Sequence, residues 1–296
     1  SPELVEWNSG PVQVTGVSIP IASNAVMLFF AAIAWPSSIM LLVRTLFGAS
    51  TPVLVSAAAI SVALPAFPLL LLEYGVLFPY MMSLSMIAVP IALIIETCRQ
   101  ESWARRWPLI VAALGSLPGI AIAHPGGFVA LLVFTTVALG VFWIRLLFSD
   151  AARGRKIATS VWALGYAVAA LASWYVLRPP AAARTWGTTE TLGQAVGEVL
   201  TVSVWAAPVN IVVMSLVIVG AVVAARRRST TDWIALGFLA AAAGLYIVVS
   251  GLPYWVPRDI LTGAWYNNAP RLAALLPIAW VPLAAIGGAR LWDILG

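Results

Sequence analysis

The stretch GGFVALLVFTTVALGVFWIRLLF, residues 126–148, decides the fold. It is apolar along almost its whole length, and its one charged residue, Arg145, lies one turn from the end. An apolar stretch of about 20 residues, wound as an α-helix, spans the hydrocarbon core of a bilayer. No strand-like alternation of polar and apolar residues is present, which excludes an outer-membrane barrel. Residues 126–148 therefore predict a transmembrane helix.

Stretches of the same kind recur along the whole chain, in which 62% of the 296 residues are hydrophobic and 9% are charged. A soluble surface needs far more charge than this. We expect an all-α integral membrane protein, a single domain over residues 1–296 with a bundle of about nine transmembrane helices at 22–291. The expected spans are roughly 22–43, 53–72, 77–97, 109–123, 126–148, 157–177, 201–225, 233–252 and 271–291.

The positive charges predict the orientation of this multi-pass protein in the plasma membrane. Basic clusters fall in the connections at 44–52, 98–108, 149–156 and 226–232. Alternate threading of nine spans places all of them, and twelve of the sixteen basic residues, on one face, which the positive-inside rule makes cytoplasmic. The N-terminus is then outside and the C-terminus inside. The external face receives residues 1–21 and the longer loops 178–200 and 253–270.

Several classes of function are excluded by composition. The net charge of +5 comes from clusters that orient helices, so no nucleic-acid partner is expected and the first partner is the lipid bilayer. One cysteine, Cys98, and one histidine, His124, cannot form a cysteine-rich or histidine-cluster metal site. The chain starts at Ser1 without a signal peptide, so we expect a piece of a longer protein that has lost one or more N-terminal helices.

Two polar residues occupy tight external turns and are candidate catalytic groups. Glu73 follows LLLL and precedes Tyr74, and a carboxylate at the mouth of a groove could act as a general base or bind a metal. The alternative is a carboxylate that only marks the water interface. His124, in AIAHPGGF, could donate to a phosphate or shuttle a proton, or it could simply cap a helix corner.

The segment GLPYWVPRDILTGAWYNNAPR, residues 251–271, holds the densest group of candidate binding residues. Aromatic faces and amides suit a sugar ring, and arginine suits a pair of phosphate oxygens. The alternative is that the Trp and Tyr side chains anchor the interface and that Arg271 snorkels to lipid headgroups, but anchoring does not require two consecutive asparagines before an arginine. The candidate substrate-binding residues are Arg258, Asp259, Trp265, Tyr266, Asn267, Asn268 and Arg271.

The loop at 178–200 is expected to end in a short helix on the membrane surface, capped by Thr188 or Thr189. Its acids, Glu190 and Glu198, are expected to be exposed and form no catalytic spacing.

Three stretches together resemble a known family: FPLLLLEYGVLFPYMMSLSMIAVPIAL at 67–93, AHPGGFVALL at 123–132, and LTGAWYNNAPRLAALLPIAWVPLAAIGG at 261–288. They are similar to a family of actinobacterial multi-pass membrane proteins, largely uncharacterised, which resembles the GT-C glycosyltransferases that use polyprenyl-phosphate sugars. The resemblance implies a groove open to the extracytoplasmic side, a polyprenyl-phosphate lipid as partner, and transfer of sugar to a cell-envelope glycan. Enzymes of that class typically carry their catalytic acid in the first external loop, where this chain offers Glu3 and Glu6.

Under this hypothesis Arg271 or Arg258 holds the phosphate, Asn267 and Asn268 orient sugar or phosphate, and Glu73 is the candidate base. No cofactor is identified; a divalent cation, Mg²⁺ or Mn²⁺, could take part, although the sequence shows no cluster of ligands for it. The alternative is a non-catalytic membrane subunit, working with other membrane subunits, or a transporter of lipid-linked glycan that uses the same groove only to bind or pass lipid.

Overall fold

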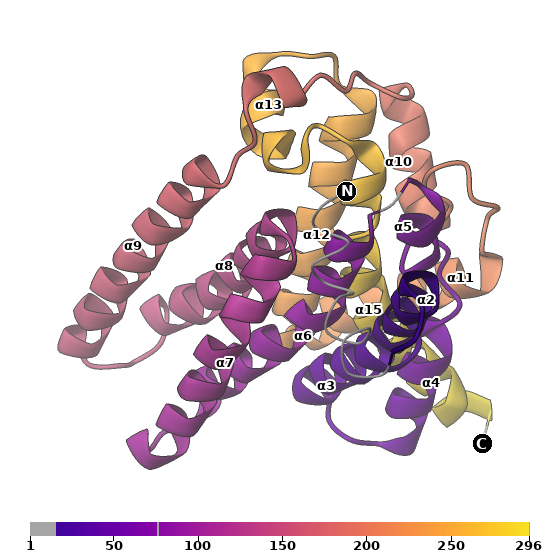
Figure 1. Ribbon diagram of the computed structural model, residues 1–296. Coiled ribbons are helices and arrows are strands. Elements are labelled where there is room, and N and C mark those ends of the chain that lie inside the picture. Colours follow the sequence, from indigo (N-terminus) through magenta and orange to yellow (C-terminus); the bar gives the residue numbers. More distant parts are fainter. Residues whose placement is uncertain (1–15, 76, 296) are drawn as a thin grey trace.

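The computed structural model describes residues 16–75 and 77–295, and all regular structure within them is helical (Figure 1). Glu3 and Glu6 lie outside the described residues. The long helices are α6 (Phe78–Arg99), α7 (Trp103–Ala123), α8 (Pro125–Leu147), α9 (Arg153–Val176), α11 (Ile211–Arg227), α12 (Thr230–Gly251) and α15 (Leu276–Leu295). The shorter elements are α2 (Ile19–Phe29), η1 (Phe30–Ala34), α3 (Trp35–Phe47), α4 (Thr51–Ser61), α5 (Leu69–Glu73), η2 (Ala181–Ala183), α10 (Leu192–Thr201), α13 (Val256–Thr262), η3 (Gly263–Trp265) and α14 (Ala269–Ala273).

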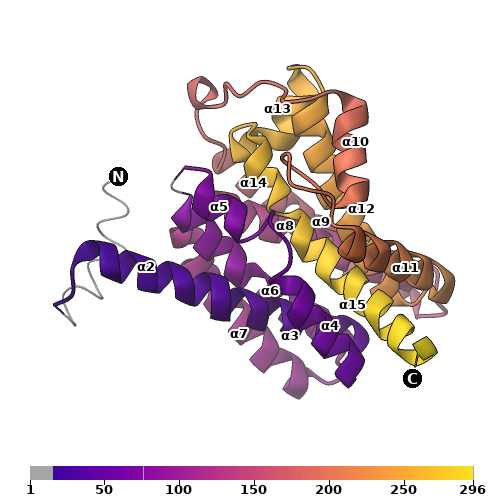
Figure 2. The same cartoon turned by 90° about the vertical axis from the view of Figure 1, so that its right-hand side faces the viewer.

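Helix α15 is the centre of the bundle. Of the most apolar window of the segment Ala269–Ile294, 89% is buried inside the protein, whereas the corresponding window of α9 is 0% buried. Helices α3, α4, α11 and α12 all pack against α15, and Figure 2 shows α15 running between α4 and α11. The apolar surface of α15 is thus covered by other helices, whereas that of α9 is left to contact lipid.

Seven helical segments within the described residues are long and apolar enough to cross a membrane, which fits a polytopic membrane protein. They correspond to seven of the nine expected spans. The expected span 53–72 is instead divided into α4 and α5, because Pro65 and Pro68 cannot continue a helix. The expected span 201–225 begins only at Ile211, after Pro208 and the capping residue Asn210, which leaves α11 with 17 residues. Helices α4 and α11 pack beside α15 as shorter helices.

The first long segment, Ile19–Phe47, changes from α-helical to π-helical hydrogen bonding where a proline interrupts it. Its central part, Phe30–Ala34, has π-helical hydrogen bonding and directly precedes Trp35 and Pro36. Proline has no N–H to donate and its ring crowds the preceding turn, so the widened turn relieves that clash. After the π-helical turn, Ser38 donates a hydrogen bond to the Ser85 carbonyl and ties α3 to α6.

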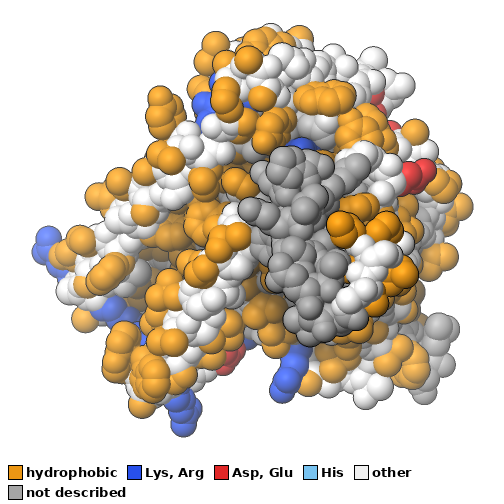
Figure 3. Space-filling view, viewed as in Figure 1, with side chains coloured by type: hydrophobic (Ala, Val, Ile, Leu, Met, Phe, Trp, Pro, Cys, Tyr) orange, Lys and Arg blue, Asp and Glu red, His pale blue; other side chains and the backbone are white. Residues whose placement is uncertain are grey.

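The two ends of the bundle differ in charge. We call the end that holds α13, α10 and the α7–α8 corner the α13 end, and the opposite end the basic end (Figure 1). All four predicted basic clusters adjoin the basic end, where most of the Lys and Arg side chains visible in Figure 3 also gather. There Arg99 donates to the Thr45 carbonyl, Arg145 to the Arg228 carbonyl, and Arg227 pairs with Asp232 at 2.7 Å.

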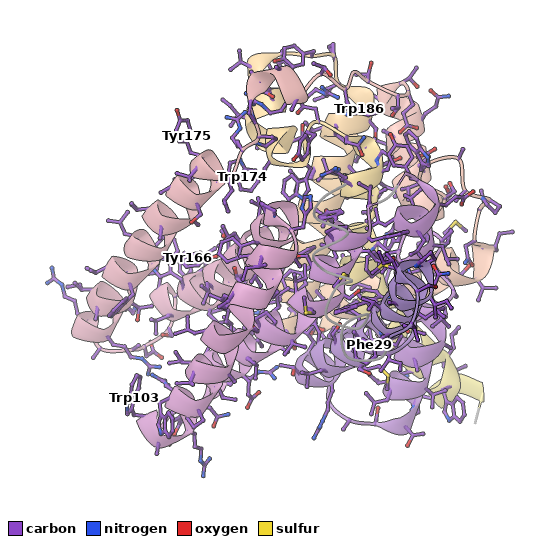
Figure 4. The ribbon with its side chains drawn as sticks, viewed as in Figure 1. Phe29, Trp103, Tyr166, Trp174, Tyr175 and Trp186 are labelled. Carbon is purple, nitrogen blue, oxygen red and sulfur yellow. The ribbon has the colours of Figure 1, made fainter. Side chains whose placement is uncertain are left out.

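Aromatic and apolar side chains cover the flanks of the bundle. Figure 3 shows hydrophobic side chains over most of the visible surface, and Figure 4 places Trp103 near the basic end and Tyr175 and Trp186 toward the α13 end. All three are exposed. Tryptophan and tyrosine favour the two membrane–water interfaces, so their positions fit helices that span a bilayer between the two ends.

Candidate functional site at the α13 end

Three side chains from separate elements meet around Arg271, and we call the four residues the Arg271 cluster: Tyr80, His124, Tyr266 and Arg271. The guanidinium carbon of Arg271 lies 4.3 Å from the centre of the Tyr266 ring and 5.8 Å from that of Tyr80. Its Nη1 atom is 3.3 Å from His124 Nε2. Arg271, His124 and Tyr266 are each partly exposed, so the cluster can be reached from outside the protein.

The hydrogen bonds of His124 leave two donors facing each other. His124 caps α8, and its Nδ1 atom accepts the Gly126 N–H at 2.9 Å. A neutral imidazole with Nδ1 as acceptor carries its proton on Nε2. That N–H then points at Arg271, whose guanidinium has only donors, so neither group satisfies the other. An oxygen atom to one side of the pair, at hydrogen-bond distance from both nitrogens, would accept from both.

No carboxylate neutralises Arg271 in the described part of the chain. The ion pairs found there involve Arg99, Arg178, Arg184 and Arg227. Arg271 is instead supported by aromatic faces, a cation–π arrangement that holds a guanidinium without cancelling its charge. The cluster therefore keeps a positive charge that is available to an anion.

Close packing fixes His124 relative to Tyr80. The two rings meet edge to face with centres 5.0 Å apart, and the Tyr80 hydroxyl donates to the Arg271 carbonyl at 2.8 Å. Ser83, one turn further along α6, donates to the Ile120 carbonyl at 2.9 Å. A Cβ on Gly127 would lie 2.0 Å from Ser83 Oγ, so only glycine lets α8 begin this close to α6.

The two asparagines shape the backbone beside the cluster, and both of their amides are engaged within the protein. Tyr266 and Asn267 have left-handed φ angles of 64° and 57°, a conformation that asparagine tolerates and tyrosine adopts at a cost of about 1 kcal/mol or more. Asn267 accepts from the Thr262 hydroxyl and donates to the Asp259 carboxylate at 3.0 Å. Asn268 caps α14 by accepting the Arg271 N–H.

Asp259 and Arg258 serve a neighbouring network. Asp259 accepts from Arg178 at 2.8 Å and from Arg184, which ties the segment after α9 to α13. Arg258 is fully buried and donates to the carbonyls of Trp186, Gly187 and Val249. The remaining predicted residue, Trp265, is buried as well and donates to the Gly126 carbonyl at 3.0 Å. The structure thus brings His124, Tyr266 and Arg271 together and places Arg258 and Asp259 in a separate network.

Glu73 ends α5 as an exposed side chain without a hydrogen bond or ion pair to any described residue. The next residue, Tyr74, accepts a hydrogen bond from Asn268 at 3.2 Å, and α5 packs against α14. Glu73 is therefore near the cluster in the fold, but it makes no contact with His124 or Arg271.

Two expectations for residues 178–200 were wrong. The short helix is α10, and its cap is Thr191, which forms a reciprocal capping box with Gln194. Glu190 and Glu198 are partly buried instead of exposed. Both approach the hydroxyl of Tyr246, and Glu198 also accepts the backbone N–H groups of Trp205 and Ala206. No spacing along the sequence predicts that Glu190 and Glu198 meet at the Tyr246 hydroxyl, because this contact depends on the turn at residues 202–206.

The neutral state of His124 predicts that the stability of the folded protein depends on pH. Burial, with a smaller contribution from the Arg271 charge, lowers the pKa of His124 to about 3. In the unfolded chain the pKa is near 6.5, so between pH 6.5 and about 3 the unfolded state binds the extra proton and stability falls as pH falls. The slope from this group is at most about 1.4 kcal/mol for each pH unit.

His124→Asn should remove that part of the pH dependence, because asparagine can still cap α8 but does not titrate. The measurement is the unfolding midpoint of both proteins from pH 7.5 to 4. Parallel profiles for the two proteins would contradict the assignment of a neutral histidine.

No group of three or more His, Cys, Asp or Glu side chains arranged for a metal ion is found in residues 16–75 and 77–295.

The fold and site define a polytopic helical membrane protein with a partly exposed, cationic and aromatic cluster at the α13 end. The chain belongs to the family of unknown function DUF6541, which it matches over residues 9–296. No curated protein and no solved structure matches it.

Proposed function

We propose that the Arg271 cluster binds the phosphate of a polyprenyl-phosphate sugar, and that the protein is a glycosyltransferase of the GT-C kind which transfers that sugar to a cell-envelope glycan. The observation that carries the proposal is the pair of facing donors, His124 Nε2–H and the Arg271 guanidinium, 3.3 Å apart. A phosphate oxygen to one side of the pair, at hydrogen-bond distance from both nitrogens, would accept from both, and charge-assisted hydrogen bonds such as that from Arg271 are the strong ones.

The orientation we propose places the α13 end on the extracytoplasmic face of the plasma membrane. The basic clusters at the opposite end support this, because positive residues remain in the cytoplasm. Arg271 lies near the start of Ala269–Ile294, a segment long and apolar enough to cross a membrane, and in the orientation we propose it would lie close to the lipid headgroups. With nine crossings, the N-terminus would be outside and the C-terminus inside.

The proposed reaction is a displacement at the anomeric carbon. The acceptor hydroxyl oxygen forms the new bond to that carbon, the bond from the carbon to the phosphate oxygen breaks, and the lipid phosphate leaves with the electron pair. Arg271 and His124 stabilise the charge that develops on the leaving phosphate. The hydroxyl proton goes to a carboxylate, and Glu73 is the candidate base on the element next to the cluster.

A second candidate is a non-catalytic lipid-binding subunit or a transporter of lipid-linked glycan. One observation favours it: within the described residues, no carboxylate hydrogen-bonds or ion-pairs with His124 or Arg271. The phosphate site would be the same in both cases. The two candidates differ only in whether bond transfer follows binding.

The test uses the purified protein in lipid nanodiscs with three ligands: a polyprenyl-phosphate sugar, the polyprenyl phosphate and the uncharged polyprenol. We expect both phosphates to bind at least tenfold more tightly than polyprenol, because only they satisfy the two facing donors. Equal binding of polyprenol would contradict the phosphate site. Transfer of labelled sugar to an envelope glycan acceptor would identify the transferase, and binding without transfer would favour the second candidate.

A further inference from the structure

Arg178 and Arg184 meet at the carboxylate of Asp259 at the α13 end, and we call these three residues the Arg178 site. We propose that the Arg178 site binds the phosphate of an anionic phospholipid, whose acyl chains lie along the exposed surface of α9. The proposal does not depend on the proposed sugar transfer, because it concerns other residues and a lipid of the surrounding bilayer.

The first observation is that the Arg178 site carries more positive than negative charge. Arg178 Nη2 lies 2.8 Å from Asp259 Oδ2, and Arg184 Nη1 donates to the same oxygen. A Cβ on Gly263 would lie 2.9 Å from each of these two nitrogens, so both guanidinium groups pack against one point of the backbone. Among the described residues, Asp259 is the one carboxylate that pairs with either arginine. One carboxylate cannot neutralise two neighbouring guanidinium groups, so the site favours a second anion.

The second observation is that each guanidinium group keeps donors without a partner. Arg178 uses Nη2 alone, for the carbonyl and the carboxylate of Asp259, and Arg184 uses Nη1 alone. The Nε atoms of both arginines are buried and form no hydrogen bond with any described residue. The two side chains remain 16% and 14% exposed, so a ligand can approach them from outside the protein. Phosphate oxygens accept several arginine N–H groups at once and would satisfy donors that the protein leaves free.

The third observation places the site where a lipid headgroup can reach it. Arg178 follows Val176, the last residue of α9, by two positions. Helix α9 has 24 residues, which at about 1.5 Å for each residue are enough to cross roughly 30 Å of hydrocarbon from the basic end. None of its residues is buried by protein, so acyl chains have access to its whole outer surface. The Arg178 site therefore lies at the level of the headgroups, directly above a surface that lipid covers.

The fourth observation is the orientation of α13, the helix that carries Asp259. Its apolar side chains face outward, with Val256 71% and Ile260 50% exposed, whereas Arg258 and Thr262 are fully buried. Figure 3 shows hydrophobic side chains beside Lys or Arg at this end of the molecule. A helix in water exposes its polar face, and α13 does the reverse, as helices that lie in the boundary between headgroups and acyl chains do. Lipid thus contacts the helix that holds both arginines.

The test titrates the purified, delipidated full chain in detergent with phosphatidylglycerol and with phosphatidylcholine of the same oleoyl chains. Native mass spectrometry gives the Kd of the first lipid bound. We expect phosphatidylglycerol to bind about tenfold more tightly, because the choline cation offsets the phosphate charge that the arginines recognise. Glycerol phosphate, which lacks the acyl chains, should not displace it at equal concentration. Equal affinities for the two lipids, or displacement by glycerol phosphate, would contradict a phospholipid site.

Variants locate the bound lipid. Arg184→Gln removes one guanidinium group and leaves the ion pair of Arg178 with Asp259, and it should lower the affinity for phosphatidylglycerol to that for phosphatidylcholine. Arg153→Gln removes the same charge from the exposed opposite end of α9 and is the matched control. Arg153→Gln and Arg271→Ala should both bind phosphatidylglycerol as the unchanged protein does. If Arg184→Gln also binds it as tightly as the unchanged protein, the inference is wrong.

The unfolding midpoint of the unchanged protein gives a measurement that does not depend on how the variants fold. Phosphatidylglycerol should raise the midpoint with the logarithm of its concentration above the Kd, because it binds the folded state. Phosphatidylcholine at the same concentrations should raise it less. The same rise with both lipids would show that the protein does not select an anionic headgroup.

Discussion

Arg271→Ala should weaken binding of the polyprenyl-phosphate sugar and slow sugar transfer, each by about 100-fold or more. Removing one preorganised donor to a developing oxyanion commonly costs a factor of 10²–10³. In this protein the substitution also leaves the His124 Nε2–H without its partner in holding the phosphate. The measurement is the Kd of the polyprenyl phosphate together with the rate of transfer, each determined in nanodiscs.

Two further variants make the Arg271 result specific. Arg271→Lys keeps the charge but loses the planar fork of donors, and should recover only part of the loss. Arg290→Ala removes an exposed arginine near the other end of the segment Ala269–Ile294, in α15, and should change neither quantity. Unchanged binding and turnover in Arg271→Ala would remove Arg271 from the proposed phosphate site.

Gly287→Ala should destabilise the bundle by about 3 kcal/mol, which is the upper part of the usual range for overpacking. A Cβ on Gly287 would lie 2.1 Å from the Leu216 carbonyl oxygen, and a Cβ on Gly220 would lie 1.8 Å from the Leu283 carbonyl oxygen. Each glycine thus faces the backbone of the other helix, and α11 and α15 must separate to admit a methyl group. Small residues allow helices in membranes to approach this closely.

Gly244→Ala provides the matched control for the glycine prediction. Gly244 is also in the interior of a long helix, α12, but nothing lies within 4 Å of where its Cβ would be. Its replacement should leave the unfolding midpoint unchanged or raise it slightly, because alanine favours helix over glycine. Equal midpoints for the two variants would show that α11 and α15 can adjust without cost.

Much of the fold could be predicted from local patterns. Hydropathy located six helical segments, among them α8 and α12, to within four residues at each end, because the bilayer sets the length of an apolar span. It also located α7, which begins at Trp103, six residues before the expected start. The same reasoning failed at Pro65 and Pro208. Hydropathy averages over a window, whereas one missing N–H group ends a helix at a particular residue.

The candidate site, too, could be predicted from the sequence only in part. The sequence singled out His124, Tyr266 and Arg271 as polar or aromatic residues at helix mouths, and the structure brings them together. The sequence did not distinguish Arg271, which is partly exposed, from Arg258, which is fully buried and donates to three backbone carbonyls. Both are arginines near a helix start, and only their neighbours distinguish them.

The sequence by itself therefore determined the class of protein and the end at which its polar residues gather, because hydrophobicity and charge act through the local chain. The tertiary structure alone decided which hydrogen-bond donors remain available to a ligand. It set Arg271 beside His124, which lies 147 residues earlier in the chain, and joined Glu190 to Tyr246 across 56 residues. Contacts over such separations depend on how helices pack, and no spacing along the chain encodes them.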